Sequence, residues 1–247
     1  SVFIFIPFLK ISDLLYRNGF KSPEIYTSSS DGLILLEDFG KTKLNQILNE
    51  SNQEGYYKNL VDIIIEFRKI SKNIIDNSSE FSFIQAFDER MIDELSIFFE
   101  WYPLSSGKEI DDIDHSKFLN EFSEALSKID SKLESFIHAD FHVDNLMITE
   151  DGNIGIIDYQ DGFFGHNSYD LVSLLQDARR EISENFENLM IDYYLSKTSV
   201  NKDKFLQDYH LIGLQRNLRI LGVFARKSKR DNNNNYLKFI PLVKQYI

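Results

Sequence analysis

The 247-residue sequence contains no cysteine. Disulfide bonds, thiolate metal sites and a cysteine nucleophile are therefore excluded, and the composition suits a reducing compartment. Basic residues are also scarce, because 27 lysines and arginines face 39 acidic residues and give a formal net charge of −12. Since nucleic-acid binding needs a basic surface, we expect no nucleic-acid partner.

Long hydrophobic runs are missing as well, because no apolar stretch approaches the ~20 residues that a transmembrane helix requires. The first six residues, SVFIFI, are apolar, but they carry neither a basic flank nor a small-residue cleavage site. We therefore expect no signal peptide, no membrane partner and a cytoplasmic location. Hydrophobic residues make up 43% of the chain and charged residues 27%, which is typical of a globular protein with a sizeable core.

Helical periodicity dominates the chain. Apolar residues recur at helical spacing in five segments: 7–17, 60–74, 91–102, 118–136 and 168–182. We expect Pro103 to end the third of these helices and Ser116 to cap the fourth. The acidic segment 108–114 between them is interpreted as a solvated loop.

Two pairs of short apolar runs interrupt the helical pattern. Residues 23–26 and 33–36 flank a turn rich in Ser, Asp and Gly, and residues 145–148 and 154–157 flank a turn that contains Asp-Gly. Each pair predicts a β-hairpin, because turn residues of this kind between two apolar runs are a strong hairpin signal.

The most informative stretch reads H-x-D-x-x-x-x-N from His138 to Asn145, and it is followed by the second hairpin and then by Asp158. Phosphoryl transfer requires such groups: one carboxylate meets the attacking hydroxyl, while an amide oxygen and a second carboxylate hold magnesium. A tight hairpin brings Asn145 and Asp158, thirteen residues apart, to the same end of two paired strands. With Asp140 five residues before Asn145, the spacing is that of a kinase catalytic loop in which Ala139 replaces arginine.

Two other interpretations of this stretch stay open from the residues alone. Asp and Asn favour turns, so these side chains could serve only the loop conformation. Alternatively, His138, Asp140 and His142 alternate, and on a strand they would share one face and could bind zinc in a hydrolase. The zinc hypothesis leaves Asn145 and Asp158 without a role, and the remaining histidines are scattered.

Residues 138–145 resemble the catalytic loop of the aminoglycoside phosphotransferase and choline kinase superfamily, whose pattern is H-G-D-x-H-x-x-N. Residues 156–161 are similar to the metal-binding segment of that superfamily, and residues 169–171 to its later Asp-Leu helix start. A more extended resemblance covers nearly the whole chain and points to the bacterial kinases that phosphorylate N-acetylmuramate and N-acetylglucosamine at the anomeric carbon. It rests on the segments 36–40, 100–102, 158–177, 215–218 and 221–226.

This resemblance implies an α+β, protein-kinase-like fold of two lobes, with a mostly helical C-terminal lobe and an incomplete N-terminal lobe. Residues 1–42 would be the remnant of the nucleotide-binding lobe and its hinge, and residues 43–247 would be the helical catalytic and acceptor-binding lobe. ATP and Mg²⁺ are the implied cofactors. The oligomeric state stays open.

The resemblance also implies roles for single residues. Asp140 is expected to be the catalytic base and Asn145 and Asp158 the magnesium ligands, while His138 would brace the catalytic loop. The residues expected to touch adenine are Leu36, Glu37, Asp38 and Phe39.

Two further residues are expected to support the catalytic loop. His142 occupies a family position to which the resemblance assigns no particular role. Asp170 would accept hydrogen bonds from the backbone of the loop, although a carboxylate that only favours a helix N-terminus is an equally compatible role.

The N-terminal region departs from the superfamily pattern. None of the 11 glycines forms a G-x-G, so no phosphate-covering loop is visible. The first forty residues also lack a strand lysine ahead of a helix: Lys10 lies within a helical pattern, and only Asp13 could replace the usual helix glutamate. We expect that the first strands of the small lobe are missing from this sequence. The alternative is a degenerate, inactive nucleotide-binding homologue, which the retained Asp140, Asn145 and Asp158 disfavour.

The expected acceptor is a small amino sugar, with aminoglycosides and choline-type alcohols as alternatives. Polar side chains beyond the metal site suit hydroxyl and acetamido groups, and an aromatic ring could stack on a sugar. The candidates are Gln160, Asp161, Asp177, Gln215, Arg216 and Trp101. Residues 215–230 hold six basic and no acidic side chains, so this segment could attract an anionic acceptor such as the lactyl carboxylate of muramate, or could be a solvated helix end.

Overall fold

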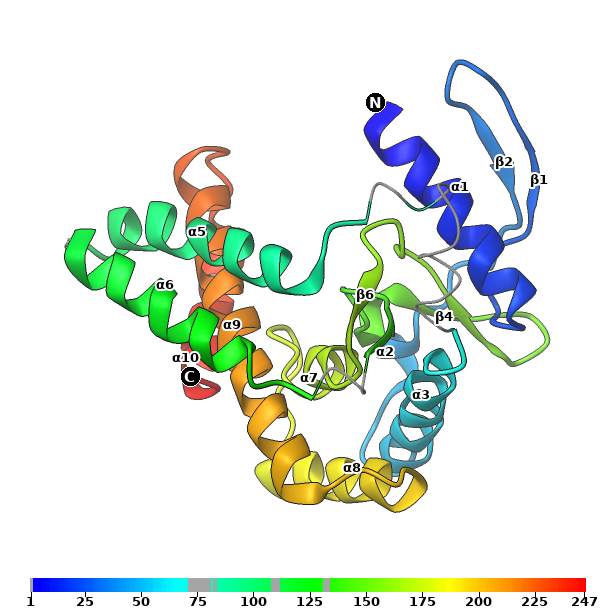
Figure 1. Ribbon diagram of the computed structural model, residues 1–247. Helices are drawn as coiled ribbons and strands as arrows, with labels where there is room; N and C mark the ends of the chain where they lie inside the picture. The colour runs from blue at the N-terminus through cyan, green and yellow to red at the C-terminus, as the bar shows by residue number, and fades with distance from the viewer. Residues whose placement is uncertain (1, 71–80, 82–83, 108–111, 131–133) are drawn as a thin grey trace.

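The computed structural model describes residues 2–70, 81, 84–107, 112–130 and 134–247 (Figure 1). Its N-terminal part consists of helix α1 (Val2–Arg17) and the antiparallel strands β1 (Ile25–Ser28) and β2 (Ile34–Leu36). The first predicted hairpin is therefore confirmed. In Figure 1, α1 and this hairpin lie side by side at the blue end of the chain, away from the long helices α5, α6 and α9.

The remainder of the described chain is mostly helical. Its helices are α2 (Leu44–Ile47), α3 (Gln53–Phe67), α5 (Phe87–Ser106), α6 (Asp112–Leu126), α7 (Tyr169–Leu175), α8 (Glu184–Lys197), α9 (Lys202–Lys229) and α10 (Ile240–Gln245), with 3-10 turns η3 (Val143–Asn145) and η4 (Asn234–Phe239). Helix α9 is central, because it packs along α5 and also against α7, η4 and α10. None of the described helices has both the length and the apolar composition needed to cross a membrane.

Short antiparallel strand pairs lie between these helices. Strand β3 (Glu134–Ile137) pairs with β6 (Phe163–His166), and β4 (Leu146–Ile148) pairs with β5 (Ile154–Ile156). The second predicted hairpin is thus confirmed. It is also held from both sides by the N-terminal part, because the N–H of Ile156 donates to the carbonyl of Lys21 (2.8 Å) and the N–H of Ile148 donates to that of Thr42 (2.9 Å).

Helix α1 reaches the same region through side chains. The ring of Tyr159 stacks on Phe8 with 5.2 Å between centroids, and its hydroxyl donates to Oγ of Ser12 at 2.9 Å. The N-terminal part therefore contacts the residue that follows Asp158, and the fold places α1, the hairpin β4–β5 and the catalytic loop next to one another.

Several helix boundaries differ from the prediction, and α3 ends at Phe67, within the predicted segment 60–74. Pro103 lies inside α5, which continues to Ser106 and ends at Gly107 in the left-handed conformation (φ 68°). A proline removes one hydrogen bond without forbidding continuation, whereas a left-handed glycine is a common helix end. Ser116 lies inside α6 and does not cap it, and Phe136 belongs to β3. The apolar spacing across 118–136 therefore spans a helix and a strand.

Helix α7 is also shorter than the predicted segment 168–182, because it ends at Leu175. The side chain of Asp177 accepts a hydrogen bond from the backbone N–H of Arg179 (2.9 Å), and such local bonds compete with helix continuation. The predicted acidic loop is wrong for Asp112 and Asp114, which belong to α6, while residues 108–111 of that loop and residues 71–74 of the second predicted helix lie outside the described residues.

Candidate active site

The backbone of the catalytic loop is fixed by a buried carboxylate. Strand β3 ends at Ile137, and the carboxylate of Asp170 on α7 accepts from the N–H groups of His138 (2.7 Å) and Ala139 (3.1 Å). Asp170 is fully buried, and burial raises its pKa to about 7, although the two N–H donors oppose this shift. Ala139 adopts a left-handed backbone (φ 78°), which the two bonds hold in place. Asp170 thus supports the loop as the resemblance implies.

The ring of His138 connects the loop to the strand that leads to Asp158. Its Nε2 lies 3.0 Å from the carbonyl oxygen of Ile157, and its Nδ1 accepts from the N–H of Asp140 at 3.3 Å. These contacts define a neutral ring with the proton on Nε2. Complete burial lowers the pKa of His138 from 6.5 to about 4, in agreement with a neutral bracing side chain.

This shift predicts a pH dependence of folding. Between pH 6.5 and about 4 the unfolded chain binds a proton at His138 that the folded protein does not. The free energy of unfolding should therefore fall as the pH is lowered through this window, by on the order of 3 kcal/mol for the whole shift. Urea unfolding at pH 7 and pH 5 measures this. The His138→Gln variant should show a smaller pH dependence, and an unchanged dependence would contradict the assignment.

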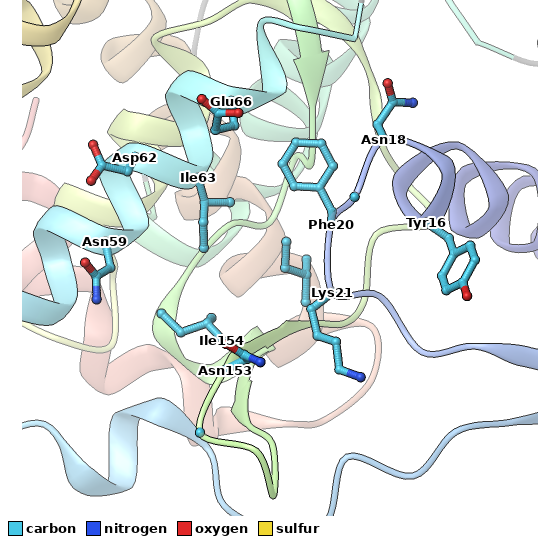
Figure 2. A pocket seen from close by; sticks show the side chains of 13 residues that line it. Tyr16, Asn18, Phe20, Lys21, Asn59, Asp62, Ile63, Glu66, Asn153 and Ile154 are labelled. Carbon is cyan, nitrogen blue, oxygen red and sulfur yellow. The ribbon is translucent and has the colours of Figure 1, made fainter.

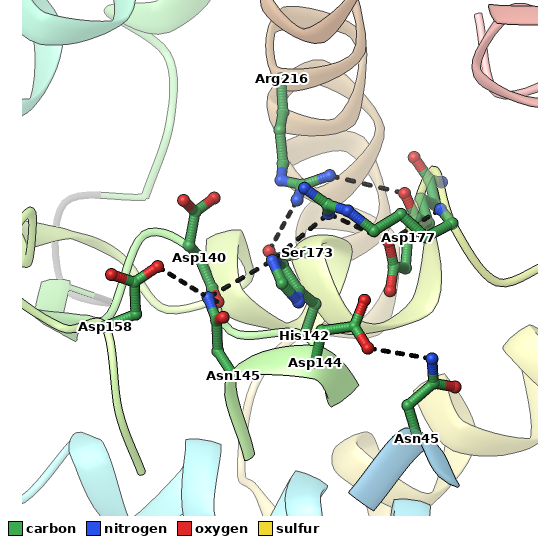
Figure 3. Close-up of polar contacts among 11 residues, drawn as sticks. Asn45, Asp140, His142, Asp144, Asn145, Asp158, Ser173, Asp177 and Arg216 are labelled. Atoms are coloured by element: carbon green, nitrogen blue, oxygen red, sulfur yellow. Dashed lines mark hydrogen bonds and ion pairs between the residues drawn. The ribbon is translucent and has the colours of Figure 1, made fainter. Parts of the chain in front are cut away.

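Asn145 and Asp158 meet at the base of the hairpin β4–β5, as the thirteen-residue spacing predicts (Figure 3). The side-chain Nδ2 of Asn145 donates to the backbone carbonyl of Asp140 (3.0 Å) and faces Oδ2 of Asp158 at 3.3 Å. Asp158 has a left-handed backbone (φ 66°), and its Oδ1 accepts from Nε2 of Gln160 at 2.9 Å. The candidate acceptor residue Gln160 therefore lies against the metal-ligand candidate.

These donors fit a hard divalent cation. Because Nδ2 of Asn145 faces the carbonyl of Asp140 and the carboxylate of Asp158, its Oδ1 lies on the opposite side of the amide. Mg²⁺ is usually held by one or two protein oxygen ligands together with water and substrate phosphates. In the part of the chain that the structure describes, no three His, Asp or Glu side chains are grouped to hold a metal ion. Since β3 ends before His138 and both of its ring nitrogens are engaged, the zinc hypothesis is wrong.

Asp140 lies beside these groups and is mostly buried. Burial acts to raise its pKa, but the positive charges of Arg216 and Arg219 outweigh burial and hold the pKa below its ordinary value. Arg216 is 3% exposed; its Nη2 donates to Oγ of Ser173 (2.8 Å) and its Nη1 to the carbonyl of Gln176 (3.4 Å). The arrangement leaves Asp140 ionised and able to accept a proton.

A cavity of about 270 Å³ lies next to the hairpin and is lined by the hinge residues expected to touch adenine, together with Met147, Ile157, Pro23 and Gly40. The hinge residues are Leu36, Glu37, Asp38 and Phe39. Two of these side chains already have protein partners. The carboxylate of Glu37 accepts hydrogen bonds from Nζ of Lys21 (2.9 Å) and from the N–H of Glu24 (3.2 Å). The carboxylate of Asp38 accepts from the N–H of Gly40 (2.8 Å). In the hinge backbone, the N–H of Glu37 donates to the carbonyl of Glu24 (2.8 Å).

A larger cavity of about 680 Å³ lies between the end of α1, helix α3 and the turn of the hairpin β4–β5 (Figure 2). None of the catalytic candidates is among its lining residues. Two of its charged side chains already have partners, because Lys21 binds Glu37 and Asp62 accepts from the hydroxyl of Tyr193 (3.0 Å). We therefore assign the chemistry to the smaller cavity and the catalytic loop.

The acceptor candidates are only partly brought together. Asp161 lies near the site: its backbone carbonyl accepts from Arg90 (2.8 Å), and burial raises the pKa of its side chain. Gln215 is turned toward α5, where it donates to the carbonyl of Met91 at 3.0 Å. Trp101 lies half-buried on α5, eleven residues or about 16 Å along the helix from Arg90.

The basic segment 215–230 is divided by the structure. Arg216 is buried near Asp140, and Arg219 lies 3.2 Å from the carboxylate of Glu94. Near the C-terminal end of α9, Lys227 lies over the ring of Tyr236. The segment therefore does not form one continuous patch.

The sequence prediction missed three residues that support the catalytic loop, two by direct contact and one through Asn45. Nη1 of Arg179 lies 3.3 Å from Nε2 of His142, and Nη1 of Arg180 donates to Oδ1 of Asn45 (3.1 Å), whose Nδ2 donates to Asp144 (2.9 Å). Both arginines fall within the segment 168–182, which was predicted to be one helix, but they follow the end of α7 at Leu175. Asp177 precedes them and also binds Arg179.

Comparisons with known proteins identify the family of this chain. The profile described as "Phosphotransferase enzyme family" matches residues 6–206. The N-acetylmuramate/N-acetylglucosamine kinase of Neisseria meningitidis serogroup B is 30% identical over 252 residues, which cover 98% of this chain and 73% of that protein. The kinase of the same name from Caulobacter vibrioides is 28% identical and is covered over 69% of its length, with 97% of this chain matched.

Solved structures show the same fold. A Plasmodium vivax ethanolamine kinase superposes with a TM-score of 0.67 at 15% identity, covering 97% of this chain and 71% of that one. The ADP-bound aminoglycoside phosphotransferase APH(2'')-Ib has a TM-score of 0.61 at 15% identity, with coverage of 97% and 80%. The α+β, protein-kinase-like fold and the predicted resemblance are therefore confirmed. Because the profile spans most of the chain and the named relatives are kinases, this protein is a phosphotransferase that belongs to the phosphotransferase enzyme family.

Proposed function

We propose that this protein transfers the γ-phosphoryl group of ATP to the anomeric hydroxyl of N-acetylmuramate or N-acetylglucosamine in the cytoplasm. The observation that carries the proposal is the grouping of Asp140, Asn145 and Asp158 beside the hinge cavity. The names of the relatives, which are kinases of these two sugars, support the choice of acceptor. The ADP-bound structural neighbour supports a nucleotide in the hinge cavity.

In this proposal each group has one task. The ionised Asp140 accepts the proton of the sugar hydroxyl as that hydroxyl attacks the γ-phosphorus, and the hinge backbone holds the purine. Magnesium, which Asn145 Oδ1 and Asp158 would hold, neutralises phosphate charge when it is bound. Asp170 and His138 keep the loop in place through the backbone bonds described above.

The charge around Asp140 favours an anionic or neutral acceptor. Arg216 and Arg219 both act on Asp140, and in the described part of the chain Arg216 makes no ion pair with an acidic side chain. Arg216, whose described hydrogen bonds go to a hydroxyl and a carbonyl, would also attract a substrate carboxylate such as the lactyl group of muramate. Aminoglycosides and choline-type alcohols are cationic and offer no such carboxylate.

The product distinguishes the proposed reaction from its alternatives. With the full-length gene product, ATP and a panel of sugars, we expect a sugar 1-phosphate from N-acetylmuramate and from N-acetylglucosamine. Phosphorylation at the anomeric hydroxyl locks the ring, so the product cannot reduce an aldehyde reagent, and phosphorus NMR locates the ester.

Three results would contradict the proposal. A 6-phosphate would keep the reducing end free and would refute the anomeric assignment. Phosphorylation of kanamycin-like or choline-like acceptors alone would refute the amino-sugar assignment. Nucleotide binding without any transfer would favour an inactive homologue.

A further inference from the structure

His142 lies between the catalytic loop and the loop that joins α7 to α8, and it is only 4% exposed. Two nitrogen atoms approach its Nε2: Nδ2 of Asn145 at 3.3 Å and Nη1 of Arg179 at 3.3 Å (Figure 3). A guanidinium can donate hydrogen bonds but cannot accept them. Nε2 must therefore present a lone pair to Arg179.

The geometry selects one tautomer of this ring. With the proton on Nδ1, the single lone pair of Nε2 is shared between the two donors, Asn145 and Arg179. With the proton on Nε2, its N–H would oppose the N–H of Arg179. Nδ1 is buried and has no hydrogen-bond partner among the described residues, so it does not favour either form. The contacts of Nε2 therefore determine the tautomer, and His142 is a neutral ring with its proton on Nδ1.

The same contacts fix the amide of Asn145. Its Nδ2 faces three acceptors: the carbonyl of Asp140, the carboxylate of Asp158 and Nε2 of His142. If the amide turned by 180°, Oδ1 would face these three acceptors without a proton between them. Because an unmade bond at a buried polar group costs about 1–3 kcal/mol, the observed orientation is strongly preferred. It turns Oδ1 away from these three acceptors.

We propose that His142 and Arg179 are positioning residues for Asn145: Arg179 fixes the tautomer of His142, and His142 fixes the amide of Asn145 so that its Oδ1 serves as a metal ligand. This inference rests on the proposed role of Asn145 in holding magnesium. Arg179 also contacts Asp177, through its backbone N–H (2.9 Å) and through Nη1 (3.6 Å), so the orientation of Asn145 depends on the loop after α7.

The test measures metal-dependent nucleotide binding and does not depend on turnover. A fluorescent ADP analogue is titrated into each variant in EDTA and at increasing Mg²⁺. His142→Leu removes the acceptor, and we expect it to raise the Mg²⁺ requirement about 10–100-fold, as loss of an outer-shell partner typically does. Binding in EDTA should stay unchanged. His142→Gln, whose side-chain carbonyl can replace Nε2 as acceptor, should restore the requirement to within a few-fold of wild type.

Two further variants make the result decisive. Arg179→Met should shift the Mg²⁺ requirement in the same direction as His142→Leu, and Arg179→Lys should shift it less. Asn145→Ala gives the increase in the Mg²⁺ requirement that follows from complete loss of this metal ligand. If Asn145→Ala changes the Mg²⁺ requirement but His142→Leu does not, the positioning role is refuted while the metal site stands. If Asn145→Ala has no effect, the proposed metal role itself fails. If His142→Leu and His142→Gln both weaken binding of the ADP analogue equally in EDTA and in Mg²⁺, His142 has a purely structural role.

Discussion

Replacement of Asp140 by asparagine should lower the rate of phosphoryl transfer by about 10²–10⁴, because the amide has the shape of the carboxylate but cannot accept the hydroxyl proton. The backbone carbonyl of Asp140, which accepts from Asn145, is unchanged by this substitution. We therefore expect the variant to fold and to bind Mg²⁺ and ADP with wild-type affinity. The measurement is kcat with ATP and N-acetylglucosamine in a coupled ADP-release assay.

The matched control for this variant is Asp151→Asn. Asp151 is exposed in the turn of the hairpin β4–β5, and its carboxylate bonds only locally, to Thr149 and Asn153. The Asp151→Asn variant should retain the wild-type rate of phosphoryl transfer. If the Asp140→Asn enzyme keeps the wild-type kcat, the assignment of this loop as the catalytic loop is refuted.

Replacement of Asp158 by alanine should abolish magnesium-dependent nucleotide binding over the range in which the wild type binds. Asp158 offers a carboxylate at the proposed cation position and also holds Nε2 of Gln160 (2.9 Å). Loss of outer-shell partners alone typically costs 10–100-fold in metal affinity, so loss of a direct ligand should exceed about 100-fold. Isothermal titration of ADP with Mg²⁺ measures this change, and Asp151→Ala on the same hairpin is the control. Wild-type affinity in Asp158→Ala would refute the metal site.

The parts of the site that could be predicted from the sequence are those encoded by short spacing. Asp140, Asn145 and Asp158 lie on one loop and one tight hairpin, so their relative positions follow from local geometry. Five consecutive residues, 36–40, line the hinge cavity and lie together for the same reason, whereas Pro23, Met147 and Ile157 reach it from other parts of the chain.

The acceptor side could not be predicted in this way, because it depends on how helices rotate and where they end. Gln215 and Arg216 are neighbours in the sequence, yet they bond to different helices: Gln215 to α5 and Arg216 to α7. Likewise, apolar residues continue at helical spacing beyond Leu175, but the side chain of Asp177 bonds to the backbone of Arg179 and α7 ends. Tertiary contacts with the catalytic loop outweigh the local pattern there.

The attachment of the hairpin β4–β5 on both sides has a consequence for how the chain folds and how it can be dissected. The N–H groups of Ile148 and Ile156 pair with carbonyls of Thr42 and Lys21, which lie more than 100 positions earlier in the chain. The hairpin can form its own ladder early, but these two bonds wait for the N-terminal segment to dock, and such distant pairings are slow to form. A fragment cut after residue 42 would lose the carbonyls of Lys21 and Thr42 together with the stacking of Phe8 on Tyr159. Residues 2–42 therefore act as a third strand-like partner of the catalytic hairpin. A separately expressed C-terminal fragment would carry its catalytic groups on an incompletely bonded support.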